Sequence, residues 1–162
     1  MVRRLTPPVV LLFAFGALAD ERSPVSKCVQ TLHTANRQRI AWSALPGQRS
    51  EQEVVRELGF QLSADHSLID QALMQYAGSN EILLEDEALP DEPMKNLDGR
   101  QFDSVFLRTV DRHSALMLRS ADACLRLTAE PQLRRVLNKT IATYREHQRA
   151  VERAYRELLP AT

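Results

Sequence analysis

The chain has 162 residues, of which 21 are basic, 21 are acidic and 44% are hydrophobic, with only five glycines. Because basic and acidic residues are equal in number, the chain has no excess of positive charge with which to bind nucleic acid, so we expect no nucleic-acid partner. The hydrophobic content and the scarcity of glycine exclude a disordered chain and a turn-rich β protein.

Residues 1–19 are typical of a secretory signal peptide. Arg3 and Arg4 form a basic start, an apolar stretch follows over 9–18, and Ala17-Leu18-Ala19 is a cleavage signal. The apolar stretch is too short to span a membrane comfortably, although an uncleaved anchor helix is the alternative. We therefore expect residues 20–162 to form one periplasmic or secreted domain with no transmembrane segment. Its formal net charge would be 19 − 21 = −2, because only two basic residues leave with the signal.

Four stretches place apolar residues three and four positions apart, which predicts four helices. They cover about 26–45, 50–77, 100–127 and 131–158. Pro46-Gly47 is expected to end the first helix, Ser50 to cap the second and Pro131 to lie in the first turn of the fourth.

Residues 79–99 break the helical period and form a long connection that contains Pro90, Pro93 and several acidic residues. Short links make neighbouring helices antiparallel. About twenty extended residues can cover about 60 Å, which is enough to run the length of a bundle. The sequence therefore predicts an all-α, ferritin-like four-helix bundle with a long crossover between the second and third helices.

Cys28 and Cys124 are the two cysteines of the chain. An even pair in an oxidising compartment favours a disulfide. Cys28 lies near the start of the first helix and Cys124 near the end of the third, and these ends meet only if the crossover is present. A bridge requires Cα atoms within about 7 Å. The bridge and the crossover are therefore linked predictions, and two free buried thiols are the alternative.

Each predicted helix carries one histidine on its apolar face. They are His33, His66, His113 and His147. Counted from the end where the first two helices join, their positions differ by about five residues, which corresponds to about 7 Å along a helix axis. Neutral imidazole is the commonest protein ligand for transition metals such as Zn, Cu and Fe. The pattern predicts a shared polar centre.

A transition-metal site in this centre would use His66, His113 and His147, with His33 or Asp65 as further ligands or orienting groups. A di-iron centre of the ferritin type is not expected, because that site needs Glu three residues before its histidines. Those positions here hold other residues: Gln30, Ser63, Val110 and Tyr144. Hydrogen-bonded core histidines without metal are the alternative.

The chain resembles a bacterial family of secreted four-helix proteins, domain of unknown function 4142, labelled "predicted outer membrane protein". The matching segments are Leu32-His33-x-x-Asn36, Leu62-x-x-Asp65-His66, Leu97-x-Gly99-x-x-Phe102-Asp103, His113 and His147-x-x-Ala150. The resemblance implies a ferritin-like bundle with histidines at 66, 113 and 147 and no established activity. Arg39 stands where the family usually has Glu, and Ala142 where it has Pro.

Three functions follow as hypotheses. The leading one is a secreted bundle that binds a transition metal in metal handling or stress protection. The second is a structural or interaction domain, with a protein partner that the sequence does not identify. The third, a metal-dependent oxidoreductase, lacks the expected carboxylates, so an enzyme is the less favoured reading.

Overall fold

The computed structural model describes residues 23–88 and 93–158, and all regular structure in these ranges is helical. The described residues form four long helices and one short helix, which lies between the first two long ones. Their bounds are α1 Pro24–Ser43, α2 Pro46–Arg49, α3 Glu53–Ser79, α4 Gly99–Leu127 and α5 Pro131–Leu158. The predicted all-α four-helix class is therefore confirmed. The proposed signal peptide, residues 1–19, lies outside the described residues.

The largest local difference from the predicted elements lies between the first two long helices. α1 ends at Ser43, and Pro46 begins the four-residue α2 instead of simply ending the first helix. Ser50 does not cap α3 directly. Its hydroxyl accepts a hydrogen bond from the Gln52 N–H at 3.1 Å, and α3 begins after Gln52. Proline suits the first turn of a helix, which explains why Pro46 starts one here.

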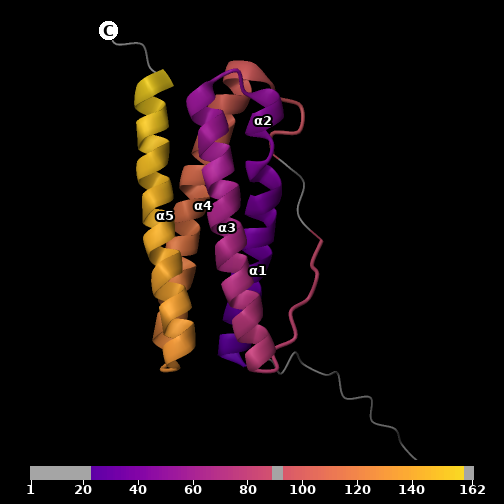
Figure 1. Cartoon of the computed structure of the whole chain (residues 1–162), viewed down its shortest axis with the longest axis vertical. Helices are drawn as coiled ribbons and strands as arrows, with labels where there is room; N and C mark the ends of the chain where they lie inside the picture. The colour runs from indigo at the N-terminus through magenta and orange to yellow at the C-terminus, as the bar shows by residue number, and fades with distance from the viewer. Residues whose placement is uncertain (1–22, 89–92, 159–162) are drawn as a thin grey trace, which may run out of the picture.

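The connection between α3 and α4 leaves the bundle at the end where α3 finishes, and its described residues 93–98 lie at the opposite end (Figure 1). Because it returns to the end where α3 began, α3 and α4 run in the same direction, as the predicted crossover requires. α1 packs against α3 and α4, and α5 packs against the same two helices. α1 and α5 therefore lie across the bundle diagonal from each other.

A disulfide joins α1 to α4 at one end of the bundle. It links Cys28 with Cys124, whose Cα atoms are 6.0 Å apart. This is the end at which the crossover topology was predicted to bring the two cysteines together. The crossover and the cysteine pairing therefore agree.

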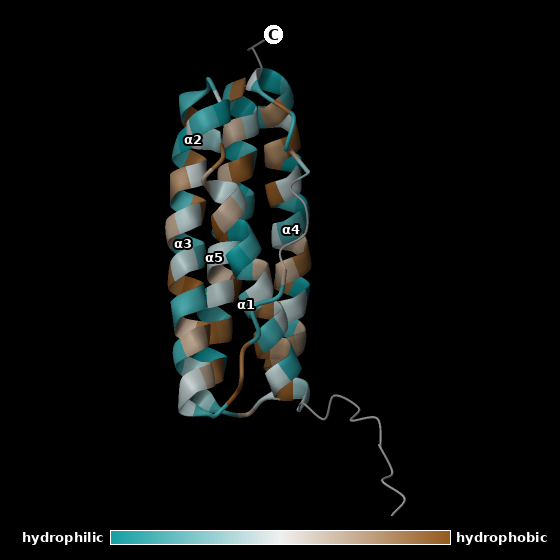
Figure 2. Cartoon of the chain, turned by 90° about the vertical axis from the view of Figure 1, so that its right-hand side faces the viewer, coloured by the Kyte–Doolittle hydropathy of each residue, from teal (hydrophilic) through white to brown (hydrophobic). Residues whose placement is uncertain are grey.

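Two apolar clusters fill the bundle, and a layer of buried polar side chains separates them. We call them the disulfide-end cluster, which includes Val29, Leu32, Leu73, Leu133 and Leu137, and the opposite-end cluster, which includes Val55, Leu62, Phe102, Phe106 and Val151. Hydrophilic and hydrophobic residues alternate along each helix (Figure 2). The helices thus place an apolar stripe inward at both ends and interrupt it in the middle.

The polar layer is defined here by buried residues of all four long helices. They are Asn36, Arg39, His66, His113, Tyr144 and His147. The polar layer is thus enclosed between the two apolar clusters of the bundle.

Across the part of the chain that the structure describes, no helix combines the length and the apolar character needed to cross a membrane.

Candidate functional site

The rings of the polar layer gather around Tyr144 of α5. The Tyr144 ring centroid lies 5.4 Å from that of His66, 5.6 Å from that of His147 and 6.4 Å from that of His113. His66 and His147 also contact each other, with ring centroids 5.0 Å apart. His66 and His147 therefore contact each other, and His113 of a third helix joins them through Tyr144; we call these three histidines the imidazole cluster.

Asn36 of α1 fixes the orientation of one of these rings. Its amide Nδ2 donates to the Leu32 carbonyl at 2.8 Å, which leaves the side-chain oxygen as an acceptor. That oxygen lies 2.8 Å from His66 Nδ1 and accepts from the Tyr144 hydroxyl at 3.3 Å. His66 must then carry its proton on Nδ1, and its lone pair is on Nε2.

Asp65 of α3 fixes the orientation of the His147 ring in the same way. Its carboxylate lies 3.0 Å from His147 Nε2, so that nitrogen donates and Nδ1 keeps the lone pair. The His147 side chain is fully buried, whereas that of Asp65 is 31% exposed. A carboxylate that holds the far nitrogen of a histidine is the usual outer partner of a metal-binding imidazole.

Two ring nitrogens of the cluster are left without a hydrogen-bond partner among the described residues. They are His147 Nδ1 and His113 Nε2, and both are buried. Buried polar atoms are normally paired, because an unpaired one keeps the full cost of its desolvation. The cluster thus contains two buried imidazole nitrogens that form no hydrogen bond with a described residue.

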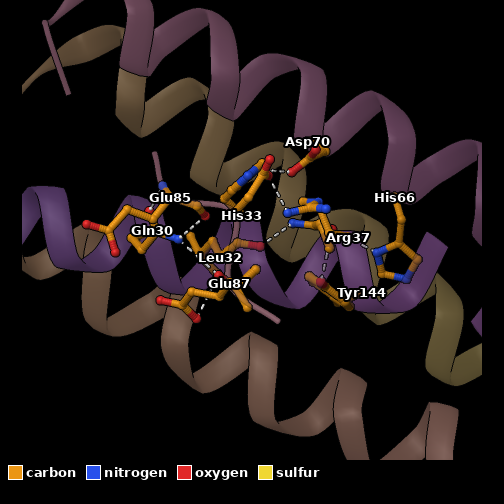
Figure 3. Close-up of polar contacts among 12 residues, drawn as sticks. Gln30, Leu32, His33, Arg37, His66, Asp70, Glu85, Glu87 and Tyr144 are labelled. Atoms are coloured by element: carbon orange, nitrogen blue, oxygen red, sulfur yellow. Dashed lines mark hydrogen bonds and ion pairs between the residues drawn. The ribbon is translucent and has the colours of Figure 1, made fainter. Parts of the chain in front are cut away.

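His33 stands apart from the cluster. Its Nδ1 lies 2.8 Å from Asp70 Oδ1, and both side chains are nearly buried between α1 and α3. Figure 3 shows His33 against Asp70, apart from His66 and Tyr144. The structure therefore gives His33 a carboxylate partner and does not bring it into ring contact with the other three histidines.

The crossover covers α1 beside this pair. Gln30 donates to the Glu85 carbonyl at 3.0 Å and accepts from the Glu85 N–H at 2.8 Å (Figure 3). Thr34 bonds Glu87 at 3.2 Å, and Arg37 pairs with Asp86 at 2.5 Å. These contacts hold the long connection along one side of the bundle.

Burial keeps the three clustered imidazoles neutral. Desolvation lowers the pKa of His66 well below its ordinary value, with further lowering by His147, Arg39 and His113. Desolvation, and then the charge of Arg39, lowers the pKa of His113 to about 2. The pKa of His147 is also lowered by burial, although Asp65 opposes the shift. Neutral imidazole is the form that binds metals.

Arg39 of α1 places a buried positive charge in the same layer. It is 3% exposed, its Nη2 donates to the Thr109 carbonyl at 3.2 Å, and its guanidinium lies 4.8 Å from the Trp42 ring centroid. Burial lowers its pKa from 12.5 to about 9, which leaves it charged at neutral pH. The neighbouring Tyr144 hydroxyl has its pKa raised, chiefly by burial, and stays protonated.

The structure thus gathers His66, His113 and His147 with Asp65 as an outer partner, and it pairs His33 with Asp70. Sequence reasoning did not single out Asp70, although it follows His66 by one helical turn and so lies on the same side of α3. Across the described ranges, no three His, Cys, Asp or Glu side chains stand together as a ready group able to hold a metal ion.

A family model described as "Domain of unknown function (DUF4142)" matches residues 17–154. The chain belongs to this family. The resemblance predicted from the sequence is thereby confirmed, and membership brings no activity with it. No curated protein matches the chain.

Solved structures share the fold at low sequence identity. A DUF305 fragment from Deinococcus radiodurans is 19% identical, with a TM-score of 0.73, over 84% of this chain and 98% of that one. A putative secreted DUF305 protein from Streptomyces coelicolor is 14% identical, with a TM-score of 0.66, over 78% and 88%. A structure of CopM in the Cu(I)-bound form is 12% identical, with a TM-score of 0.72, over 84% and 98%. At these identities the likeness concerns the fold alone.

Proposed function

We propose that this DUF4142 bundle binds one transition-metal ion through His66, His113 and His147 and acts in metal handling rather than catalysis. The observation that carries the proposal is the pair of buried, unpartnered nitrogens, His113 Nε2 and His147 Nδ1. Each lies on a ring held neutral by burial. An imidazole lone pair that meets no donor in the protein is available to a metal ion.

The outer contacts support the same role. Asp65 and Asn36 hold the far nitrogens of His147 and His66, so the remaining lone pairs are on the nitrogens that would face an ion. Such partners fix the tautomer and raise the basicity of a ligand histidine. Since the side chains do not stand as a ready group of three ligands, binding requires rotation of at least one ring. One solved neighbour, CopM, is known in a Cu(I)-bound form.

We place this function outside the cytoplasm. Residues 1–19 have the pattern of a secretory signal, and the Cys28–Cys124 disulfide suits an oxidising compartment. One solved neighbour is described as a secreted protein. A secreted bundle with a closed metal site would store, carry or sequester the ion rather than expose it to substrates.

The second candidate is a structural domain whose histidines only form hydrogen bonds. It is favoured by His33, His66 and His147, each of which already bonds a side chain of another helix. His113 distinguishes the two, because its Nε2 has no such partner among the described residues.

The test is equilibrium dialysis of metal-free protein against Cu, Zn and Fe salts, followed by elemental analysis. We expect about one bound ion per chain, with affinity at least about tenfold weaker in His113→Phe and His147→Phe. His33→Gln is the matched control, because its amide can still donate to Asp70 and it leaves the imidazole cluster intact. A folded wild-type protein that binds none of these ions would establish the structural alternative.

A further inference from the structure

The solvent face of α3 is almost free of charge. After Glu57, the charged residues of this helix are Asp65 and Asp70, and each of them bonds a histidine of the bundle. An exposed helix face usually carries charged residues, whereas the core of a protein interface is depleted of them. The exposed residues of α3 that we call its uncharged face are Phe60, Ala64, Ser67, Leu68, Gln71 and Met74.

Three large apolar side chains form a ridge along this face. The exposed fractions of Phe60, Leu68 and Met74 are 69%, 53% and 54%. The ridge is about 21 Å long at 1.5 Å per residue. Between α3 and α1, a hollow of about 510 Å³ is lined by Ile40 and Met74 among others, and a second hollow lies beside Val136 of α5. A ridge with a hollow on either side is a shape against which another helix packs.

The two edges of the uncharged face carry opposite charge at the same level of α3. On the α5 side, the exposed Arg135 and Lys139 line the hollow beside Leu68. On the α1 side, Asp86 of the crossover lines a hollow with Met74, and its side chain is 88% exposed. Asp86 lies in the acidic segment 85–87. Any partner that covers α3 therefore meets a basic edge and an acidic edge.

We propose that the uncharged face of α3 packs against the same face of a second copy of this chain, in a parallel dimer whose twofold axis runs along α3. A twofold interface uses the same surface of both copies. With the axis along α3, the basic edge of each copy faces the acidic edge of the other, whereas an axis across α3 would bring like edges together. Opposite charges beside a helix pair determine its partner and its orientation. This inference goes beyond the proposed metal site, which is enclosed in the bundle.

The test is sedimentation equilibrium of the disulfide-bonded protein in a chelator, with circular dichroism to check the fold of each variant. We expect a reversible dimer with a Kd below about 100 µM. Leu68→Lys buries a charge at the centre of the interface and should weaken the dimer at least about thirtyfold. Leu116→Lys is the matched control, because Leu116 is an exposed leucine of α4, across the bundle diagonal from α3. It should leave the dimer unchanged.

The orientation is tested by salt. Salt screens the attraction between opposite edges, so the wild-type dimer should weaken between about 20 mM and about 500 mM NaCl, whereas an antiparallel dimer should tighten. Arg135→Glu/Lys139→Glu makes both edges acidic, so it should weaken the parallel dimer about tenfold or more at low salt and reverse its salt dependence. This variant tests the same face if Leu68→Lys does not fold.

Three results would overturn the inference. They are a wild-type protein that stays monomeric at about 1 mM, a dimer that a folded Leu68→Lys variant retains, and a dimer that salt tightens. None of these results bears on metal binding by the imidazole cluster, because the chelator keeps the protein metal-free throughout.

Discussion

The polar layer and the disulfide-end cluster are formed by the same four helices and are both buried, but they change the free energy of unfolding in opposite directions. Leu73 of the cluster and His147 of the layer both have an exposed fraction of 0%. Burial of the leucine stabilises the fold, by about 1.5 to 3 kcal/mol relative to an exposed side chain. Burial of an imidazole with an unpaired nitrogen destabilises it.

The difference indicates that one region serves stability and the other serves function. The disulfide-end cluster and its bridge stabilise the bundle, and this stabilisation offsets the free-energy cost of burying the polar layer. A layer that contains three neutral imidazoles and an unpaired guanidinium contributes little to folding. Strained or unsatisfied groups of this kind are expected where function, rather than stability, determines the residues.

The largest expected effect comes from removing the bridge. The Cys28→Ala/Cys124→Ala variant opens a link between residues 96 positions apart, so its free energy of unfolding should fall by about 4 to 5 kcal/mol in a chain-entropy treatment. Urea unfolding followed by circular dichroism measures this loss. Under native conditions, the folded fraction of the variant should still bind metal with wild-type affinity. Lost affinity in a folded variant would show that the two regions are not separate.

The next effect is the pH dependence of His113, whose pKa burial lowers to about 2 in the folded protein. The unfolded chain takes up a proton at this histidine as the pH falls through about 6.5, while the folded protein does not. The contribution of the neutral His113 ring to the free energy of unfolding is therefore complete above pH 6.5 and is lost as the pH falls from there toward 2. Between pH 7 and pH 5 the loss should be about 2 kcal/mol.

His113→Phe removes this proton linkage. With a chelator present, its free energy of unfolding should change by about 2 kcal/mol less between pH 7 and pH 5 than that of the wild type. Ser114→Ala is the control, because Ser114 is a buried, non-titrating neighbour on the same helix. Its pH dependence should match the wild type. If the wild type and His113→Phe have equal pH dependence, then His113 is protonated in the folded state as readily as in the unfolded one.

The contrast between the regions also separates what the sequence predicts from what it does not. The apolar spacing predicted the four helices, the crossover and the inward histidines, because these follow from helical period and connection length. The spacing does not show which of two adjacent residues of the first helix, Arg39 or Ile40, faces inward. The structure buries Arg39, at 3% exposure, and leaves Ile40 only partly buried.

A physical reason accounts for that difference. From Asn36, residues three and four positions along both lie near the same helix face, one on either side of it. The choice between Arg39 and Ile40 depends on the neighbouring helices, here on the Thr109 carbonyl of α4. The partners of the histidines are undetermined by the sequence for the same reason. Asp70 lies on α3 and becomes the partner of His33 only through the packing of α1 against α3.

The smallest effect on stability, and the sharpest separation of the two roles, is expected from Asp65→Asn. The Asp65 side chain is 31% exposed, so loss of its charge beside His147 should lower the free energy of unfolding by less than about 1 kcal/mol. The amide oxygen still accepts from His147 Nε2 and keeps the tautomer, but the neutral partner makes the imidazole a weaker ligand. Metal affinity should therefore fall by about tenfold, as it does when outer partners of ligand histidines are changed. Asp70→Asn makes the same chemical change at His33, outside the imidazole cluster, and should leave metal affinity as it is. Equal losses of affinity in both variants would mean that the two histidine–aspartate pairs are equivalent. The metal site could then not be assigned to the polar layer.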